Sequence, residues 1–381
     1  MSTATLTSSP APRQSRAALL RRLSPRRLAR RMRGRLRSRF ERWLERKALD
    51  NPRFSALFYY VDGSFDRELH AVLAGKEVHA RQLVDGDAAG AEAAEFTLRR
   101  NVHRLEKGLL MRPRRDVFAK AYVAETVDAY AVARHSADAD LIRWATDVLD
   151  TYFEVVEAEG PIRPAADEYA RLRSADVPVV EVGRRIPYLR ETTPLPVSID
   201  DLEALAHRRR SVRWFDSKAV PREAVDRALA VALQSPSACN RQPFTFRVFD
   251  DPDLAQRVAE VPMGTRGYVH NIPAIAVIVG RQRAYFSERD RHLIYVDGSL
   301  AAMSFMYALE VQGIGSCPIN WPDIEERERE MSQLLGLAPD ERPIMLVAFG
   351  YPDPDGAVAY SQKKPVQEAR TYNDAPGATS E

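Results

Sequence analysis

The spacing of hydrophobic residues changes about halfway along the chain. Between residues 54 and 160, apolar side chains recur every three to four positions, as at Phe96, Val102 and Leu109, with few turn-forming residues between them. This spacing places apolar side chains on one face of a helix. The pattern therefore predicts a small helical domain over about residues 51–160.

The second half of the chain alternates short helices and strands. Apolar spacing and turn residues predict helices at residues 199–208 and 221–234, and strands at 244–249, 274–279 and 344–349. This order predicts an α+β fold, a sheet flanked by helices, over residues 196–381. Between the two halves, six prolines within residues 161–196 predict an extended connector over residues 161–195.

Residues 292–312 form a segment that is too long for a strand. The segment combines small residues, such as Gly298 and Ala302, with large apolar ones, such as Phe305 and Met306, and is apolar on nearly every side. A helix of this composition has to be buried all round. We therefore predict a long helix that packs in the core of one chain or in the interface of an oligomer.

The first part of the chain carries a concentrated positive charge. Residues 1–47 contain fourteen arginines and one lysine against two glutamates, a net charge of +13, so the other residues carry −10 of the total of +3. Apolar residues at every fourth position from Leu28 to Leu44 share one face of a helix. We predict a basic arm over residues 1–50. It is either disordered and solvated, or an amphipathic helix whose residues 13–47 bind an anionic membrane surface or a partner, although not nucleic acid. An organellar presequence is a minor alternative.

Cysteine content and hydrophobicity limit the class of protein. Cys239 and Cys317 are too few for a disulfide framework and do not lie in a paired metal-ligand spacing, which indicates a reducing, cytoplasmic location and no metal site. The longest apolar run, residues 274–279, is far shorter than the roughly 18 to 20 residues of a membrane span. We therefore expect no bilayer crossing and only peripheral membrane attachment.

Two guanidinium groups bracket a hydroxyl group at a predicted junction between a helix and a loop. Arg209, Ser211 and Arg213 lie within five residues of one another. Arginine binds phosphate oxygens through paired, charge-assisted hydrogen bonds, and serine adds a short neutral donor. The cluster predicts a phosphate site, and plain surface charge is the alternative because arginine-rich turns are common in this chain.

Two further loops combine small and polar residues. Residues 235–243, with the sequence SPSACNRQP, precede a predicted strand, and residues 313–321, with the sequence GIGSCPINW, follow the long apolar helix. Small side chains let the backbone approach a planar ligand, and Asn240 and Gln242 can both donate and accept hydrogen bonds. A helix cap followed by a turn is the alternative for the first loop. We predict that both loops contact a cofactor.

Taken in order, these segments resemble the nitroreductase family of FMN enzymes. Five family motifs match here: residues 209–215, residues 236–243, the long helix at 292–312, residues 313–318, and the FGYP sequence at 349–352 with Lys363 and Lys364 after it. Each motif is short, but five in order over about 185 residues identify the second half of the chain as similar to this family. Residues 1–195 are not covered.

The resemblance implies which residues hold FMN. Its phosphate would lie against the first motif and the late lysines, and its ring against the loop after the long helix. The second subunit of a homodimer would contribute Pro236, Ser237, Ala238 and Asn240. The implied cofactor-binding residues are Arg209, Arg210, Ser211, Arg213, Pro236, Ser237, Ala238, Asn240, Gln242, Pro318, Ile319, Asn320, Lys363 and Lys364. Backbone near Ile319 and Asn320 would face flavin N5, so no side chain is expected to be catalytic.

The resemblance also implies a reaction. We expect ping-pong hydride transfer from NADH or NADPH, through flavin N5, to an organic acceptor of the quinone, nitro or enone type. The same scaffold hosts other chemistry, so the fold alone does not choose the reaction. A specialised biosynthetic dehydrogenase or oxidase, whose substrate is recognised by the helical domain, is the second expectation. A non-catalytic flavin-binding protein, or a membrane-tethered assembly protein, is the third.

Two regions outside the matched motifs offer candidate substrate contacts. Within the sequence NVHRLEKGL, His103, Glu106 and Lys107 share one helical face, and solvent-exposed ion pairs are the alternative for them. The loop at residues 262–268 occupies the stretch where relatives contact the flavin ring, which adds Arg266. We predict these four residues as substrate contacts.

Overall fold

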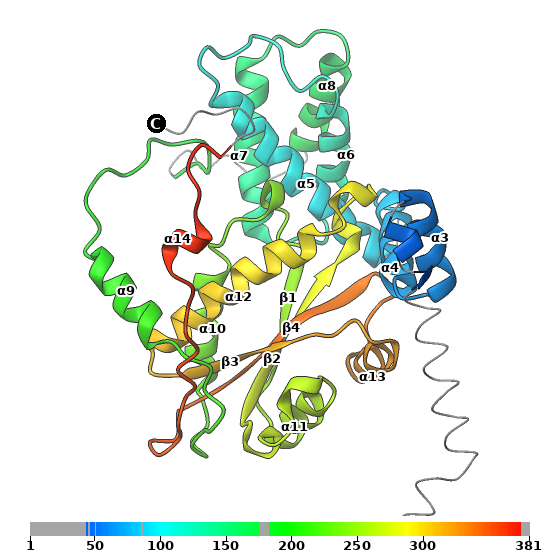
Figure 1. Cartoon of the computed structure of the whole chain (residues 1–381). Helices are drawn as coiled ribbons and strands as arrows, with labels where there is room; N and C mark the ends of the chain where they lie inside the picture. The colour runs from blue at the N-terminus through cyan, green and yellow to red at the C-terminus, as the bar shows by residue number, and fades with distance from the viewer. Residues whose placement is uncertain (1–42, 45, 50, 85–86, 175–182, 375–381) are drawn as a thin grey trace, which may run out of the picture. The chain divides into compact units, whose positions relative to one another are not determined.

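The computed structural model describes residues 43–44, 46–49, 51–84, 87–174 and 183–374 (Figure 1). Most of the predicted basic arm, residues 1–42, lies outside the described residues, so its helix and its membrane contact stay predictions. The chain divides into two compact units between Leu69 and His70. This division falls within helix α4 (Asp66–Ala80).

The described part of the first unit consists mainly of helix α3 (Pro52–Asp62). Asn51 caps its start by accepting hydrogen bonds from two backbone N–H groups, and Pro52 occupies the first turn, where no intrahelical N–H bond is lost. Gly63 ends the helix in the left-handed conformation, with a φ of 76°. No residue of α3 is buried.

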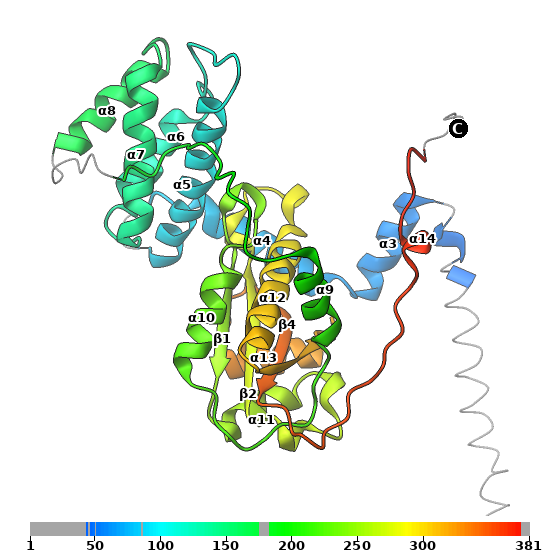
Figure 2. The same cartoon turned by 90° about the vertical axis from the view of Figure 1, so that its left-hand side faces the viewer.

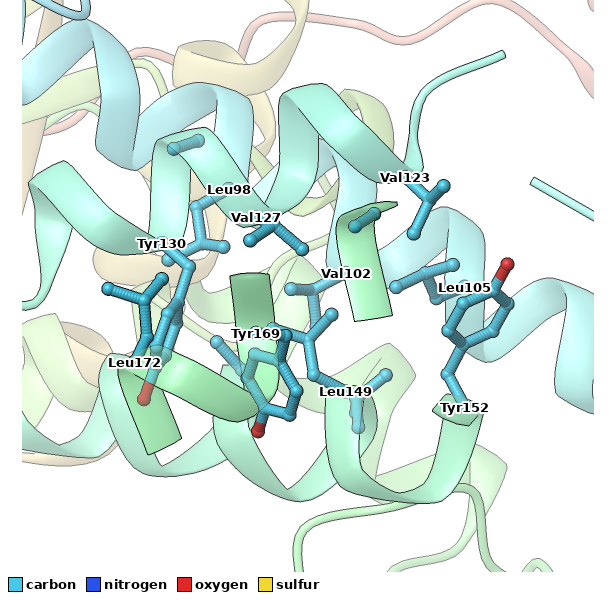
Figure 3. Close-up of a cluster of buried hydrophobic side chains, with 14 of the residues drawn as sticks. Leu98, Val102, Leu105, Val123, Val127, Tyr130, Leu149, Tyr152, Tyr169 and Leu172 are labelled. Atoms are coloured by element: carbon cyan, nitrogen blue, oxygen red, sulfur yellow. The ribbon is translucent and has the colours of Figure 1, made fainter. Parts of the chain in front are cut away.

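Four helices gather around one apolar core in the first part of the second unit. They are α5 (Ala88–Leu109), α6 (Val123–Ala133), α7 (Ala139–Val155) and α8 (Ile162–Ser174). Their apolar side chains point toward one another, and Val102, Leu149 and Tyr152 are fully buried among them (Figure 3). This core confirms the helical N-terminal region that the three-to-four spacing predicts.

The extended conformation predicted for residues 161–195 is wrong for the first part of that segment. Helix α8 occupies it and buries Ile162, Ala165 and Tyr169. Pro164 does not break this helix because it lies in the first turn, where backbone N–H groups have no intrahelical partner. From residue 183 to residue 198 the chain contains neither helix nor strand.

The second part of this unit is built on a four-stranded antiparallel sheet. Its strands are β1 (Phe244–Phe249), β2 (Ala274–Arg281), β3 (Gly315–Asn320) and β4 (Glu341–Gly350), in the order β1-β2-β4-β3. Three of the four lie where the apolar pattern predicts strands. Together with the flanking helices, the sheet confirms the predicted α+β fold.

Strand β3 corrects the prediction of a loop over residues 313–321. Its glycines and Pro318 resemble a loop in composition, yet β3 forms an edge of the sheet and pairs there with β4. An edge strand tolerates proline because one of its two edges has no ladder partner to lose. A bulge at Ile344 likewise accommodates Pro343 and lets β4 begin at Glu341, before the predicted start.

Helices cover both faces of the sheet (Figures 1 and 2). On one face, α10 (Arg222–Ala232) and α12 (Leu293–Val311) share a core with the strands, in which Phe305 and Phe349 are buried. On the other face, α11 (Pro252–Glu260) and α13 (Glu325–Leu335) form a second core. Helices α9 (Ile199–Arg208) and α14 (Val366–Ala369) contribute no buried residue.

Helix α12 is the long apolar helix that the sequence predicts, but only one of its sides is buried within the chain. Ala301, Ala302 and Phe305 are fully buried. Leu300 is 43% exposed and Val311 is 71% exposed. Burial on every side is therefore not reached within a single chain, and the exposed side presents an apolar surface.

The four-helix core is joined to the sheet largely by charged contacts. Glu92 on α5 pairs with Arg281 at the end of β2 and with Arg283, and the Arg283 guanidinium also donates two hydrogen bonds of 2.7 Å to Asp340. The buried His79 contacts the carbonyl oxygen of Arg283 at 3.0 Å. A small apolar cluster around Phe96 and Tyr285 lies at the same junction. Glu92 and Phe96 thus hold α5 beside the sheet, and His79 holds the end of α4 at the same place.

Candidate cofactor and substrate site

Three of the five motif segments lie together at one end of the sheet. Ser211 forms a bridge with Ser316 on β3, and the backbone N–H of Val212 donates to the Ser316 carbonyl oxygen at 3.0 Å. Phe215 bridges Pro352, which lies just after β4. Residues 209–215 are thereby held against the chain segments that carry the glycine-rich motif and the FGYP motif.

Polar atoms without partners lie in this region. Arg209 Nε and Ser316 Oγ are buried and have no hydrogen-bond partner within the described residues. Buried polar groups are normally hydrogen-bonded, so unpaired donors here fit a ligand that carries acceptor oxygens. Arg210 is directed elsewhere, because its Nη1 donates to the carbonyl oxygens of Ala206 and Arg209 at 3.3 and 2.9 Å.

Arg213 lies on the surface beside a buried tyrosine. Its guanidinium carbon is 5.8 Å from the centroid of the Tyr268 ring. The Tyr268 hydroxyl is 3.8 Å from Cys317 Sγ on β3. Burial raises the pKa of Tyr268 to about 12, so its hydroxyl stays protonated at neutral pH. Arg213 therefore adds a permanent positive charge next to a neutral tyrosine.

The residues predicted to face the flavin ring differ in exposure. Ile319 is buried in the core, Pro318 is half-buried and Asn320, at the end of β3, is exposed. The Ile319 side chain is thus part of the packing, and only its backbone can face a cofactor. Arg266 is exposed in the loop at residues 262–268, where a Cβ on Gly264 would lie 3.6 Å from the Ile319 side chain.

The late lysines lie on an arm that follows β4. Lys363 and Lys364 are exposed. The same arm carries Tyr360, which is 82% exposed, and Val366 at the start of α14 is also exposed. The arm therefore presents positive and apolar side chains that the chain itself does not cover.

The loop between α10 and β1 has an unusual backbone. Cys239, Asn240 and Gln242 have φ values of 53°, 54° and 53°, in the left-handed region. A non-glycine residue in this conformation costs on the order of 1 kcal/mol or more and persists where other contacts hold it. Here the Gln242 N–H donates to Ser237 Oγ at 3.1 Å, and Gln242 Nε2 donates to Asn240 Oδ1 at 3.0 Å. The loop is held in one specific shape.

Asp297 on α12 anchors this loop. Its buried carboxylate accepts a hydrogen bond from the backbone N–H of Ala238 at 3.0 Å, and the Tyr285 hydroxyl donates to it at 3.4 Å. Burial raises the pKa of Asp297 above its ordinary value, and the hydrogen bond from Ala238 opposes that shift. Asp297 was not among the predicted residues, although an acid inside an otherwise apolar helix is a visible signal.

The two predicted parts of the cofactor site lie at opposite ends of the sheet in one chain. Ser316 on β3 pairs with Phe349, which in turn pairs with Ala274 at the start of β2. Phe244 directly follows the loop at residues 236–243 and pairs with Gly280. The stretch of β2 from Ala274 to Gly280 spans roughly 20 Å, at about 3.4 Å per residue.

The length of helix α12 gives a similar distance between residues 209–215 and the loop at residues 236–242, independently of strand β2. Near its start, Asp297 holds the backbone of Ala238. Near its end, Glu310 pairs with Arg208 at 3.0 Å, directly before the first motif. The rise from Asp297 to Glu310 is roughly 20 Å, at about 1.5 Å per residue. Two elements of the fold therefore place the two loops far apart.

Two of the predicted substrate contacts on α5, His103 and Glu106, have polar neighbours within the four-helix region, and their contact with a substrate stays a prediction. Glu106 accepts a hydrogen bond from Trp144 Nε1 at 3.1 Å, within the four-helix region, and burial raises its pKa. His103 Nδ1 lies 3.9 Å from Glu106, and burial lowers the pKa of His103. A cavity of about 470 Å³ lies between α5 and the loop, and its lining includes Arg100 and Arg104 instead. Both arginines lie on the same helix, Arg100 before His103 and Arg104 between His103 and Glu106.

The part of the chain that the structure describes contains neither a candidate metal-ion cluster nor a candidate membrane-spanning helix. Within it, no group of three or more histidine, cysteine, aspartate or glutamate side chains is arranged to hold a metal ion. None of its helices combines the length and the apolar character needed to cross a bilayer.

The fold and the site agree with a match to a known family. Residues 206–265 and 261–351 match the model of the nitroreductase family. The C-terminal half matches the nitroreductase family. The matched residues include residues 209–215, the left-handed loop, α12 and the sheet, which confirms the family predicted from the motifs. The first 205 residues of the chain lie outside the nitroreductase match.

Individual relatives of this nitroreductase region carry two kinds of name. A putative NADH dehydrogenase/NAD(P)H nitroreductase of Methanothermobacter thermautotrophicus is 28% identical over 155 residues, which cover 40% of this chain and 78% of the relative. Iodotyrosine deiodinase 1 of Mus musculus is 22% identical over 272 residues, which cover 60% of this chain and 93% of the relative. A solved FMN-dependent nitroreductase of Clostridium difficile is 21% identical, covering 45% of this chain and 98% of that chain, with a TM-score of 0.39.

Proposed function

We propose that this protein is an FMN-dependent oxidoreductase that transfers hydride from NADH or NADPH to an organic acceptor of the quinone, nitro or enone type. The observation that carries the proposal is the unpaired, buried Arg209 Nε, in a segment held against Ser316, whose hydroxyl is also unpaired. Both lie within the nitroreductase match. The relative named NAD(P)H nitroreductase supports a nicotinamide as the reductant.

The side chains of this end of the sheet fit FMN. Arg209 and Ser211 would hold the phosphate, and Ser316 Oγ offers a further donor that has no other partner. Arg213 would place its positive charge beside the ring, where it favours the reduced form. When bound, FMN supplies a ring nitrogen that accepts and releases hydride, so the protein itself binds, orients and excludes water.

The proposed enzyme is a homodimer. The loop at residues 236–242 lies roughly 20 Å from residues 209–215 along β2, so both approach one FMN only when the loop comes from a second copy. The exposed apolar side of α12, with Leu300 and Val311, offers a surface for that copy. A two-fold axis would then create two equivalent sites. Lys363 or Lys364, on the exposed arm, would complete the phosphate contacts.

A second candidate reaction is the reductive removal of halogen from an aromatic substrate. The alignment with iodotyrosine deiodinase 1 spans 60% of this chain, more than the 40% covered by the nitroreductase relative. The same cofactor serves both reactions, so the acceptor decides between them.

The proposal is tested by an anaerobic titration of the full chain loaded with FMN. NADH or NADPH should bleach the flavin absorption, and a quinone, a nitroaromatic, an enone or an iodophenol should restore it. The acceptor that restores absorption fastest assigns the reaction class. Protein that stays colourless after incubation with FMN would contradict the proposal and would favour a non-catalytic protein.

Arg209→Ala tests the phosphate site directly. Loss of one charge-assisted contact should weaken FMN binding by about 2 kcal/mol, or about 30-fold in Kd, measured by flavin fluorescence. Arg327→Ala, on α13 and partly exposed, is the matched control and should bind FMN as the parent does. An unchanged affinity in Arg209→Ala would remove this residue from the site.

We further propose that the basic arm attaches a cytoplasmic enzyme to an anionic membrane surface. The net charge of +13 over residues 1–47 supports electrostatic attraction. Sedimentation with phosphatidylserine vesicles should depend on residues 1–50 and weaken as salt rises, because salt screens charge. Binding that does not respond to salt would contradict this account.

A further inference from the structure

A cavity with an excess of positive charge lies between α5 and the loop at residues 236–242. Its volume of about 470 Å³ is in the usual range for small-molecule sites. Four arginines and two carboxylates line it, which gives a formal charge of +2. These residues are Arg100 and Arg104 from α5, Glu125 from α6, Arg241 from the loop, and Arg289 and Asp290 from the short helix η5 (Glu288–Asp290).

Two of the four arginines already have counter-charges. Arg100 pairs with Glu125 at 2.5 Å. Arg289 lies 3.5 Å from the carboxylate of its neighbour, Asp290. These pairs involve both carboxylates of the cavity lining, so neither carboxylate is left for the other two arginines.

Arg104 and Arg241 have no ion pair within the described residues. Arg104 donates to Asn101 Oδ1 at 3.2 Å, and its guanidinium lies 3.5 Å from the centroid of the Tyr122 ring. Arg241 is only 4% exposed, its Nη1 donates to the Ala238 carbonyl oxygen at 3.3 Å, and its Nε is buried without a partner. A buried charge without a counter-charge is unfavourable, so Arg241 favours an anion in the cavity. Arg104 is only half-buried, and it adds a second guanidinium without an ion pair to the same lining.

The electrostatics around Arg241 point the same way. Burial lowers the pKa of Arg241, and the positive charge of Arg100 adds to that effect. An anion between these arginines would remove the repulsion. The rest of the lining is aromatic and apolar, with Tyr122, Phe286 and Leu293, which suits the organic body of a ligand.

We propose that this cavity binds a small organic anion, a carboxylate or a phosphate ester on an aromatic or apolar body, with Arg104 and Arg241 as its counter-charges. Arginine pairs with both anions through the same fork of N–H donors. That the anion is the substrate rests on the proposed function, because Ala238 and Cys239 belong to the loop assigned there to the flavin of the second chain. Anion binding by itself does not depend on that function.

Calorimetric titration of the full chain, loaded with FMN, tests binding without turnover. The probes are 4-nitrobenzoate, 4-nitrophenyl phosphate and the uncharged 4-nitrobenzamide, which share a nitrophenyl ring. At least one anion should bind about tenfold or more tightly than the amide, and the tighter of the two identifies carboxylate or phosphate as the recognised group. Equal binding of all three probes would overturn the proposal.

Three variants connect this preference to the cavity. Arg104→Gln should weaken binding of the preferred anion about tenfold and leave the amide unchanged, because one charge-assisted contact is lost. Arg289→Gln tests the exposed rim and should have a smaller effect in the same direction. Arg327→Gln on α13 is the control and should bind all three probes as the parent does. Unchanged anion binding in both Arg104→Gln and Arg289→Gln would also overturn the proposal.

Turnover separates this inference from the proposed function. Reduction of a nitro group to a nitroso group consumes one NAD(P)H and one proton and releases water. With the preferred anion, Arg104→Gln should raise KM about tenfold and leave kcat within twofold, since a positioning charge outside the reacting atoms is lost. Arginine-dependent binding without any turnover would contradict the oxidoreductase and support the site. Turnover of all three probes without preference would support the oxidoreductase and contradict the anion site.

Discussion

The four-helix region and the sheet region bury their apolar residues in different ways. Helices α5 to α8 share one core, whereas the sheet separates two cores, one on each face. The sheet region carries its motif residues where strands end and loops begin. The helical region carries polar contacts between its helices, such as the pair of Arg100 on α5 with Glu125 on α6. A helix that packs with one face leaves its other face free for a ligand. An added helical region can therefore change substrate specificity while the cofactor site stays the same.

The largest loss of stability is expected from a charge placed on the buried side of α12, in the sheet region. Ala302→Glu places a charge in a fully buried position and should destabilise the chain by about 3 to 5 kcal/mol, or prevent folding. Leu300→Glu, on the exposed side of the same helix, should leave the fold intact and shift a dimer to monomers in analytical ultracentrifugation. A folded, active Ala302→Glu protein would contradict the burial of this face.

A core substitution in the helical region tests whether the helical region and the sheet region unfold separately. Leu149→Ala should cost about 3 kcal/mol, because it leaves a cavity in the four-helix core. If the two regions have separate cores, urea should unfold the helical signal first while FMN fluorescence still reports an intact site. Leu110→Ala, the same substitution at an exposed position of the helical region, is the control. A single transition, with simultaneous loss of FMN, would show that the two cores unfold as one.

The smallest expected effect concerns the junction between the regions. Burial lowers the pKa of His79 below its ordinary value, while its hydrogen bond to the Arg283 carbonyl opposes the shift. As pH falls below about 6.5, the unfolded chain takes up a proton before the folded chain does, so stability falls, by at most about 1.4 kcal/mol per pH unit. Stability from this residue is therefore present at pH 7.5 and lost on acidification toward its folded pKa.

His79→Asn should remove this contribution to the pH dependence. Urea unfolding at pH 7.5, 6.5 and 5.5 should give a shallower loss of stability in the variant than in the parent. His135, which lies outside this junction, serves as the control when it is replaced by asparagine. Identical pH slopes in the parent and in His79→Asn would rule out a titrating role for the buried imidazole.

Much of the sheet region could be predicted from the sequence because its signals are local. The apolar run at residues 274–279 specifies a buried strand by itself, and the residue types of Arg209 and Ser211 suffice to propose a phosphate site there. Strand β3 could not be predicted in this way. Its glycines and Pro318 are tolerated because the strand lies at an edge, and strand order is a property of the whole sheet.

The cavity residues were missed for a related reason. Arg100 and Arg104 lie four residues apart on α5, which is visible in the sequence, but their importance depends on Arg241, which reaches the same space from a distant loop. His103 and Glu106 were predicted as substrate contacts because they share one helical face, and Glu106 accepts a hydrogen bond from Trp144 within the helical region. Only tertiary packing decides which polar face of a helix meets a ligand.

The distance of roughly 20 Å between residues 209–215 and the left-handed loop has a consequence for mixtures of chains. In the proposed homodimer, each FMN site would combine residues 209–215 of one polypeptide with the left-handed loop of the other. A protein damaged only in its phosphate segment and another damaged only in its loop are each inactive as pure populations. When the two are unfolded and reassembled together, the mixed pairs regain one intact pocket of two, so activity returns from two parents that have none.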